Sequence, residues 1–422
     1  MNPQLHNPQL HNPREYWHGL AALRGTAMLL GIALHASIPY MSTPLSGMNN
    51  WACYETPTVF CDILFWWVHV WRIPLFFFLA GFFALQTLQR HGSNGFARRR
   101  LKRLCIPYLA AVYLVGPPIY ILFSLGWYTT GQCSWEQIWH QVPLPEHLAV
   151  NSFGPSHLWF LQELIIFNLV FLFLYVALGT AEKKSSPSQA VNKKSLPWWL
   201  PVCPGILSGL MLWSDLTPLT EWHNTFLGVP PRLLYNSVFF IGGIVAYQHR
   251  SAFFQVTNFY RRHLLLALPL STAFLWMRLS GHIDHTTAIG SFALSISAGL
   301  LCWLMVYGMI GAFTTGLAIH NPVVEYLSDA SYWTYIIHLP IVVAIQIAAF
   351  DMNMNSLWKF SLVSAVTATA CLVSYQRLVR YSIIGEFLHG PRTRPLHTTE
   401  VPSFDESQQQ ATSKPSAHPR PH

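Results

Sequence analysis

The chain has 422 residues, of which 52% are hydrophobic, 14% aromatic and only 10% charged. A soluble domain carries about 25% charged residues, so this composition excludes an ordinary soluble protein and indicates a polytopic membrane protein. The net charge of +8 would suggest nucleic-acid binding in a soluble chain. Here the basic residues stand in short runs between apolar segments, as in cytoplasmic loops, and we expect no nucleic-acid partner.

Residues 1–18 form a polar leader with a short NPQLH repeat and no basic region typical of a signal peptide. Residues 19–380 alternate short polar connections with apolar stretches of the length that crosses a bilayer, about 20 residues. This pattern predicts an all-α membrane domain of about ten transmembrane helices. We place them at 19–40, 61–88, 103–125, 157–179, 197–214, 226–248, 263–280, 288–314, 332–350 and 357–380.

Loop charge gives an orientation. Alternate connections carry the basic residues: the run at 97–103, two lysine pairs at 183–194, and Arg250 with Arg261 and Arg262. The intervening connections hold no Lys or Arg at all. They are 41–60, 126–156, 215–225, 281–287 and 351–356. The positive-inside rule then places both termini in the cytoplasm, and we expect a multi-pass protein of the cytoplasmic membrane, in contact with membrane lipid.

The last residues, 381–422, include a stretch rich in Pro, Ser, Thr and Gln and predict a disordered cytoplasmic tail. The seven cysteines show no CxxC spacing, so neither a metal site nor a disulfide framework is indicated. One disulfide among Cys53, Cys61 and Cys133 is the pairing that the predicted loops leave open.

Ionisable residues inside membrane spans usually face a bundle interior or a wet cavity, because a charge facing lipid is costly. Several of the predicted spans carry such residues or strongly polar ones. They are Arg24, His35, Asp62, His69, Arg72, His157, Gln162, Glu163, Arg232, Asn236 and His338. Arginines and histidines together indicate a cavity that receives an anionic ligand and also handles a proton.

Each of these residues also has a structural interpretation. Arg24 can extend to lipid headgroups, Asp62 and His157 fall at the predicted outer boundary, and His338 fits a histidine bonded between helices. Glu163 can orient a histidine or pair with an arginine. No nucleophile elbow, P-loop or HExxH motif is present, so direct transfer with a histidine general base is the simplest chemistry.

Several segments resemble the acyltransferase-3 family of integral-membrane acyltransferases. Arg24 and His35 in LRGTAMLLGIALH have the family's spacing of an arginine, ten residues and a histidine. Further similar segments follow in the family's order: RIPLFFFLAGFFA, where Ala80 replaces the more usual serine, then RLCIPYL, SHLWFLQEL and LSDASYWTYIIHLPIV. Within the family, the chain is most similar to the glucan biosynthesis protein C branch, and this resemblance implies succinylation of periplasmic glucans.

This resemblance implies roles for the residues. His35 is expected to be the catalytic base that deprotonates an acceptor hydroxyl, and Arg24 and Arg72 are expected to hold acyl-CoA. His157, Trp159 and His338 stand at motif positions, and we add them, with Glu163 and Arg232, to the expected substrate-binding set. We expect no bound cofactor or metal, with acyl-CoA, in particular succinyl-CoA, as co-substrate. The expected acceptor is a periplasmic glucan or another carbohydrate.

Two other functions compete at this stage. A transporter of anionic glycans would also use intramembrane arginines and histidines, although the sequence shows neither an internal repeat nor paired broken helices. A non-catalytic partner of a glycosyltransferase would not need His35. An acyltransferase of another surface glycan, such as lipopolysaccharide or peptidoglycan, would use the same machinery with a different acceptor.

Overall fold

The computed structural model describes residues 13–139, 141–178, 196–282, 287–316 and 321–390. Within this part of the chain every regular element is a helix, and the one β-bridge pairs Ser46 with Glu221. The prediction of an all-α fold is therefore confirmed. Most of the predicted leader, up to residue 12, and the tail from residue 391 lie outside the described residues.

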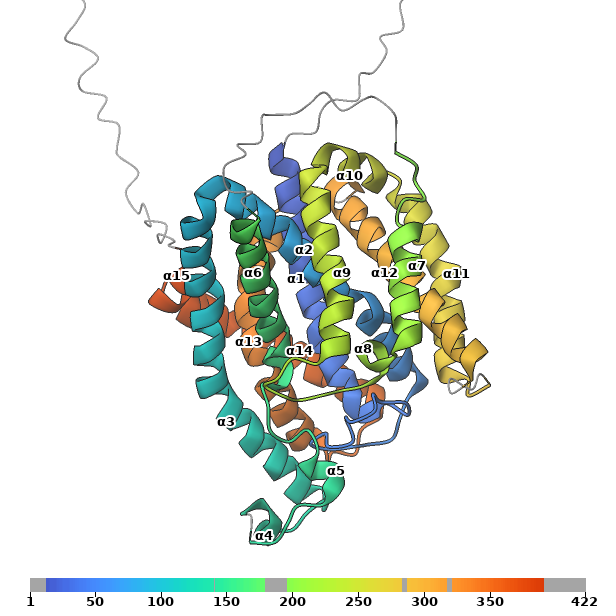
Figure 1. The fold of residues 1–422 in the computed structure, drawn as a ribbon. Coiled ribbons are helices and arrows are strands. Elements are labelled where there is room, and N and C mark those ends of the chain that lie inside the picture. The colour runs from blue at the N-terminus through green and yellow to red at the C-terminus, as the bar shows by residue number, and fades with distance from the viewer. Residues whose placement is uncertain (1–12, 140, 179–195, 283–286, 317–320, 391–422) are drawn as a thin grey trace, which may run out of the picture.

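Ten helices with 13 or more residues form the body of the described structure (Figure 1). They are α1 (Pro13–Ser37), α2 (Val59–Arg100), α3 (Ile106–Thr129), α6 (Trp159–Ala177), α7 (Val202–Ser214), α9 (Pro230–Gln248), α11 (Tyr260–Leu279), α12 (Ala288–Gly311), α13 (Pro322–Ala349) and α14 (Ser356–Ser374). Each overlaps one predicted span. The short helices are α4 (Trp135–Ile138), α5 (Glu146–Ala149), α8 (Thr217–Thr220), α10 (Arg250–Thr257) and α15 (Ile383–Leu388).

Six stretches of the described residues are long and apolar enough to cross a membrane. They comprise α1, α2 together with α3, α6, α12, α13 and α14, whereas α7 is apolar but only 13 residues long. α9 and α11 coincide with predicted spans but are not among the six. These helices support a multi-pass membrane protein, and the count of ten crossings stays a prediction.

Three boundaries differ from those expected. α13 begins at Pro322 instead of residue 332, because the Asn321 side chain accepts a hydrogen bond from the Val323 amide and caps the helix. The connection expected after the span 61–88 is instead a continuation of α2 to Arg100, with a break at Gly92, where φ is 66°. α15 lies within the predicted tail. All seven cysteines are free, so no disulfide joins the predicted loops.

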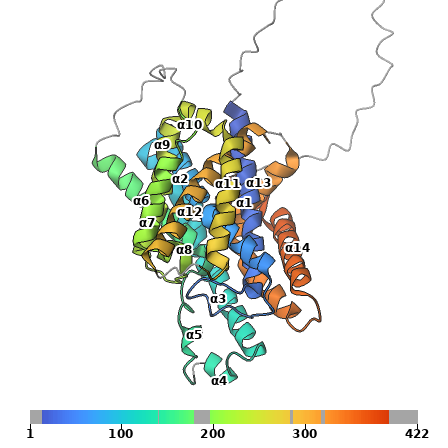
Figure 2. The same cartoon turned by 90° about the vertical axis from the view of Figure 1, so that its right-hand side faces the viewer.

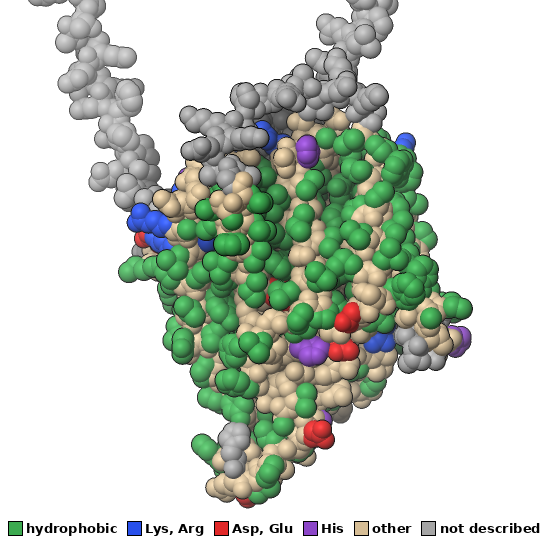
Figure 3. Space-filling model, in the orientation of Figure 1, with side chains coloured by type: hydrophobic (Ala, Val, Ile, Leu, Met, Phe, Trp, Pro, Cys, Tyr) green, Lys and Arg blue, Asp and Glu red, His purple; other side chains and the backbone are tan. Residues whose placement is uncertain are grey.

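The two ends of the bundle differ in charge. The start of α1, α10 and the connection from α2 to α3 lie at the upper end in Figure 1, and α4 and α5 lie at the opposite end, as Figure 2 also shows for α1, α10, α4 and α5. Figure 3 shows Lys and Arg side chains along the upper part and a broad apolar flank below. We call these the basic end and the loop end. The positive-inside rule assigns the basic end to the cytoplasm, and this orientation stays a prediction.

Helices α2 and α9 cross at two glycines. A Cβ on Gly81 would collide with the carbonyl oxygen of Phe240, and a Cβ on Gly243 with that of Phe78. Small residues at a helix crossing let the two backbones approach closely, as in other membrane bundles. This crossing brings polar residues of α2 and α9 to one shared cavity, and α1 and α13, which pack against each other, also line it.

A buried ion pair fastens the long segment 41–58 at the loop end. Lys359 on α14 donates to Glu55 Oε2 at 2.5 Å and to the Phe350 carbonyl oxygen at 2.7 Å. The side chains of Lys359 and Glu55 are only 4% and 11% exposed. Because a buried charge is stabilised only by its partners, this pair ties segment 41–58 to α14.

We predict that Lys359→Met destabilises the folded protein by about 3–5 kcal/mol, since it leaves the Glu55 carboxylate buried without its cation. The thermal midpoint in detergent measures the loss. The double variant Lys359→Met with Glu55→Met is the control, because removing both charges regains most of the stability. An unchanged midpoint in the single variant would show that the pair contributes nothing.

Candidate active site

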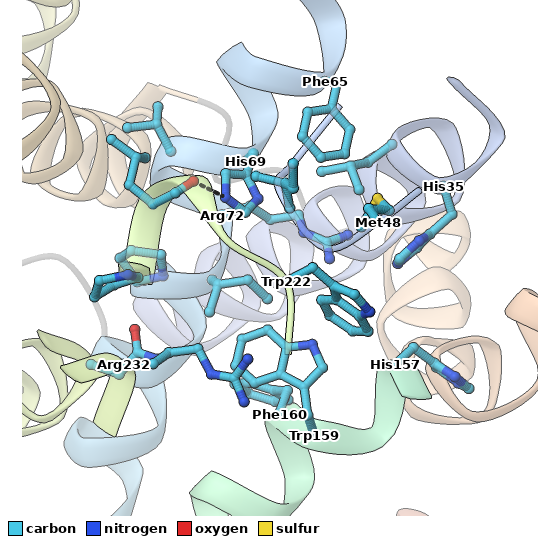
Figure 4. Close-up of a pocket in the computed structure, with 18 of the residues that line it drawn as sticks. His35, Met48, Phe65, His69, Arg72, His157, Trp159, Phe160, Trp222 and Arg232 are labelled. Carbon is cyan, nitrogen blue, oxygen red and sulfur yellow. Dashed lines mark hydrogen bonds between the residues drawn. The ribbon is translucent and has the colours of Figure 1, made fainter. Parts of the chain in front are cut away.

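A cavity of about 80 Å³ lies among α1, α2, α6, α9 and α13, near the loop end of the bundle. That volume holds several water molecules. Six of the residues expected from sequence line it. They are His35, Arg72, His157, Trp159, Arg232 and His338, and Figure 4 shows five of these labelled around one space.

His35 stands in the last turn of α1, and residues from two other segments fix its position. The Gln346 side-chain amide donates to the His35 carbonyl oxygen at 3.2 Å, and the Trp51 indole donates to Gln346 Oε1 at 3.0 Å. The Trp51 ring is stacked parallel to the His35 ring, with centroids 6.3 Å apart. The ring thus rests between the loop-end segment 41–58 and α13, with its Nδ1 buried and without a hydrogen-bond partner.

Two further histidines complete a row of three rings. His338 lies 5.1 Å from His35 between ring centroids, and His157 lies 5.1 Å from His338. Backbone carbonyls accept from His338 Nδ1, with Tyr335 O at 2.9 Å, and from His157 Nε2, with Ile336 O at 3.0 Å. A neutral imidazole that donates from one nitrogen has an acceptor at the other. His338 Nε2 and His157 Nδ1 are therefore buried acceptors, and neither has a partner in the described structure.

Arg72 on α2 is the cation of the cavity without an acidic partner among the described residues. Its side chain is buried, and its Nε has no hydrogen-bond partner. The guanidinium lies directly against Gly31 of α1, where any Cβ would overlap it. Gly31 is one helical turn before His35, so the two helices place a free guanidinium and a histidine on the same side of α1.

Arg232 on α9 is different, because its charge is already compensated. Its Nε donates to Glu163 Oε1 at 2.6 Å, and Asn236 donates to the other oxygen of Glu163 at 2.9 Å. The guanidinium also lies 4.2 Å from the ring centroid of Trp159, in a cation–π contact. Glu163 thus pairs with an arginine, one of the two roles that the sequence left open.

Two of the expected binding residues lie outside the cavity wall. Glu163 is behind Arg232, and Arg24 lies toward the basic end of α1, where it donates to Ser328 Oγ at 2.9 Å. Arg24 is more than a third exposed. Eleven residues of helix correspond to a rise of about 16 Å, which separates Arg24 from His35. The roles of Arg24 and Glu163 as binding residues stay predictions.

Some lining residues were not among those expected to form the site. His69 and Asn236 were recognised as polar residues within spans, and the spacing of three between His69 and Arg72 was the available signal. Tyr335, Glu221 and Trp222 were missed. Glu221 and Trp222 stand in a connection with no periodicity, so only the folded chain shows that they reach the cavity. The described residues contain no group of three His, Cys, Asp or Glu side chains placed for a metal ion.

Comparison with known proteins identifies the family. The model of the acyltransferase-3 family, described as an acyltransferase domain, matches residues 17–376. The chain belongs to the acyltransferase-3 family. It is therefore a membrane acyltransferase, and four of the five segments that carried the resemblance contribute residues to the cavity wall, whereas RLCIPYL does not.

Curated relatives agree with this assignment. The chain is 26% identical to the glucans biosynthesis protein C of Salmonella schwarzengrund (strain CVM19633) over 336 residues, which cover 78% of this chain and 82% of the relative. It is 25% identical to the protein of the same name from Escherichia coli O157:H7 (strain EC4115 / EHEC) over 340 residues, with the same coverage. No solved structure matches the chain.

We predict that Gly31→Ala lowers the acyl-transfer rate at least about tenfold and destabilises the protein by about 1–3 kcal/mol, because the new methyl group displaces the Arg72 guanidinium. Gly116→Ala in α3 is the matched control, since a Cβ at that position meets nothing within 4 Å. Rate and thermal midpoint are measured together. A wild-type rate in Gly31→Ala would mean that the position of Arg72 has no effect on catalysis.

Proposed function

We propose that the protein is an O-acyltransferase that moves a succinyl group from succinyl-CoA to a hydroxyl group of a periplasmic glucan at the bacterial inner membrane. One observation carries the proposal: Arg72, which is buried and has no counter-ion among the described residues, and His35 lie on one side of α1 in a single cavity. Family membership supports acyl transfer, and the name of the relatives, glucans biosynthesis protein C, supports a glucan as the acceptor.

The chemical step uses His35 as general base. A hydroxyl oxygen of the acceptor attacks the thioester carbonyl carbon while the hydroxyl proton passes to a ring nitrogen of His35. The tetrahedral intermediate then collapses with cleavage of the carbon–sulfur bond, and His35 returns the proton to the departing sulfur. The products are an ester and free CoA thiol, with no other reactant. His338 presents an acceptor nitrogen next to His35, and we assign it to support the protonated ring.

Arg72 supplies the specificity for the acyl group. A guanidinium binds a carboxylate through two parallel hydrogen bonds, and the free Arg72 is the natural partner of the distal carboxylate of a succinyl group. Arg232 is already neutralised by Glu163 and so does not compete for this anion. An acetyl group has no carboxylate and would leave Arg72 unpaired.

The charge distribution sets the direction from which each substrate enters. The phosphates of acyl-CoA favour the basic end, where Arg98, Arg99, Lys102 and Arg103 line a surface pocket, and Arg24 lies between that end and His35. The predicted loops of the loop end hold no Lys or Arg, which suits a neutral glucan. With the basic end in the cytoplasm, donor and acceptor meet at His35 from opposite sides.

We predict that His35→Ala lowers the rate of CoA release about 10²–10⁴-fold, the range for loss of a general base. The assay follows free thiol and glucan charge in proteoliposomes with succinyl-CoA and a neutral β-glucan. His147→Ala is the control, because His147 is exposed on α5 at the same end of the protein. A His35 variant with wild-type turnover would rule out the general-base role, and glucan transport without thioester consumption would favour a transporter.

We predict that Arg72→Met lowers kcat/KM for succinyl-CoA at least about tenfold more than for acetyl-CoA, because hydrogen bonds to a charged group contribute about 1.5–3 kcal/mol. Arg72→Lys keeps the charge but not the bidentate geometry, so its kcat/KM for succinyl-CoA should fall between those of the wild type and Arg72→Met. Equal losses of kcat/KM for both donors would show that Arg72 does not bind the carboxylate of the succinyl group. If the wild type uses only acetyl-CoA, the family assignment stands and the proposed succinyl donor is wrong.

A further inference from the structure

The connection between α7 and α9 contributes Glu221 and Trp222 to the cavity wall, on the side of the loop end. Trp222 is partly buried and Glu221 is exposed. Figure 4 shows the Trp222 ring projecting into the same space as Trp159, between His35 and Arg232 in this view. Two indole rings therefore border the region next to the proposed base.

The backbone of Trp222 is held from both sides. Its amide donates to Ser46 O at 2.7 Å, and its carbonyl oxygen accepts from Asn151 Nδ2 at 2.8 Å. Asn151 also accepts from the Asn224 amide at 3.1 Å. These bonds join three connections that are distant in sequence, and two of them use peptide groups of Trp222 itself. The ring is thus presented from a fixed backbone that does not depend on the side chain.

His69 adds an attachment of this connection to α2. Its Nε2 lies 3.1 Å from the Leu219 carbonyl oxygen, which accepts its proton and links the connection to α2, one turn from Arg72. The position of Trp222 relative to the reacting groups is therefore set by α2 as well as by the loops. Rigid placement of an aromatic side chain at a cavity is typical of a ligand contact, since no ordering cost is paid on binding.

The chemistry of this wall fits a neutral sugar. The negative face of an indole ring attracts the weakly positive C–H groups on the apolar face of a pyranose, and a carboxylate accepts hydrogen bonds from hydroxyl groups. Glu221 has only His223 as an ion-pair partner in the described structure, at 3.5 Å, and both side chains are more than a third exposed. The connection 215–225 carries no Lys or Arg, so it does not suit the phosphates of CoA.

We propose that Trp222 and Glu221 form the subsite for the acceptor, in which the pyranose ring that carries the reacting hydroxyl stacks on Trp222 and donates a hydroxyl hydrogen bond to Glu221. This inference rests on the proposed function and names the residues that bind its acceptor. Trp222 is then a specificity-determining residue for the sugar, whereas Arg72 and the basic end bind the donor.

The test measures binding and transfer separately. Isothermal titration of the detergent-purified protein with a neutral β-glucan oligosaccharide gives the acceptor Kd without turnover, and steady-state kinetics give KM for acceptor and donor. The variants are Trp222→Ala, Trp222→Phe and Glu221→Gln. Trp139→Ala is the control, because Trp139 is 62% exposed at the same end and does not line the cavity. Thermal midpoints confirm that the variants fold.

We expect Trp222→Ala to weaken glucan binding and raise the acceptor KM at least about tenfold, equal to about 1.4 kcal/mol, with donor KM unchanged. Trp222→Phe, which keeps an aromatic face, should recover part of the loss, Glu221→Gln should weaken binding severalfold, and Trp139→Ala should match the wild type.

Wild-type glucan affinity in Trp222→Ala, a change confined to donor KM, or absence of glucan binding to the wild type would overturn the subsite. Failure of the proposed function looks different. A wild type that binds the oligosaccharide through Trp222 but transfers no acyl group to it would keep the subsite and reject the acceptor reaction. If the wild type transfers the acyl group and Trp222→Ala does so with the same acceptor KM, the reaction is retained and the subsite is rejected.

Discussion

A buried guanidinium without an acidic partner among the described residues is the feature on which the rest of the site depends. Desolvating a charge costs several kcal/mol unless protein groups or a ligand compensate it. Arg72 is buried without such compensation, and Gly31 on the facing helix leaves space for its guanidinium because it has no Cβ. Arg232, in contrast, is neutralised by Glu163. The contrast between one compensated and one uncompensated arginine distinguishes a structural charge from a charge that is available to a ligand.

The surrounding structure holds His35, the proposed base, in place by contacts that are distant in sequence. His35 is fixed through Gln346 and Trp51, so α1, α13 and the segment 41–58 act together on one ring. Segment 41–58 is in turn tied to α14 by Lys359. Such long-range support suits a catalyst, because general acid–base chemistry requires the base within hydrogen-bond reach of the proton that it removes.

The sequence predicted the helices and the polar residues within them, because apolar length and buried charge are local signals. It also predicted six of the residues that line the cavity. It did not predict which arginine is free, since Glu163 and Arg232 are 69 positions apart and their pairing requires the packing of α6 and α9. Nor did it predict Trp222, which lies in an aperiodic connection. Its backbone is held at the cavity because its amide donates to Ser46 O and its carbonyl oxygen accepts from Asn151. The early start of α13 was missed because a capping asparagine, and not hydropathy, sets it.

The free arginine has a consequence for the turnover cycle. In the proposed reaction, the carboxylate of the transferred succinyl group leaves with the glucan and not with CoA. Departure of the product therefore leaves Arg72 without its counter-ion. The free-energy cost of an unpaired buried charge is incurred at this last step of the cycle. With the proposed succinyl donor, release of the ester is the step that leaves Arg72 without a partner, and binding of the next donor restores the pairing.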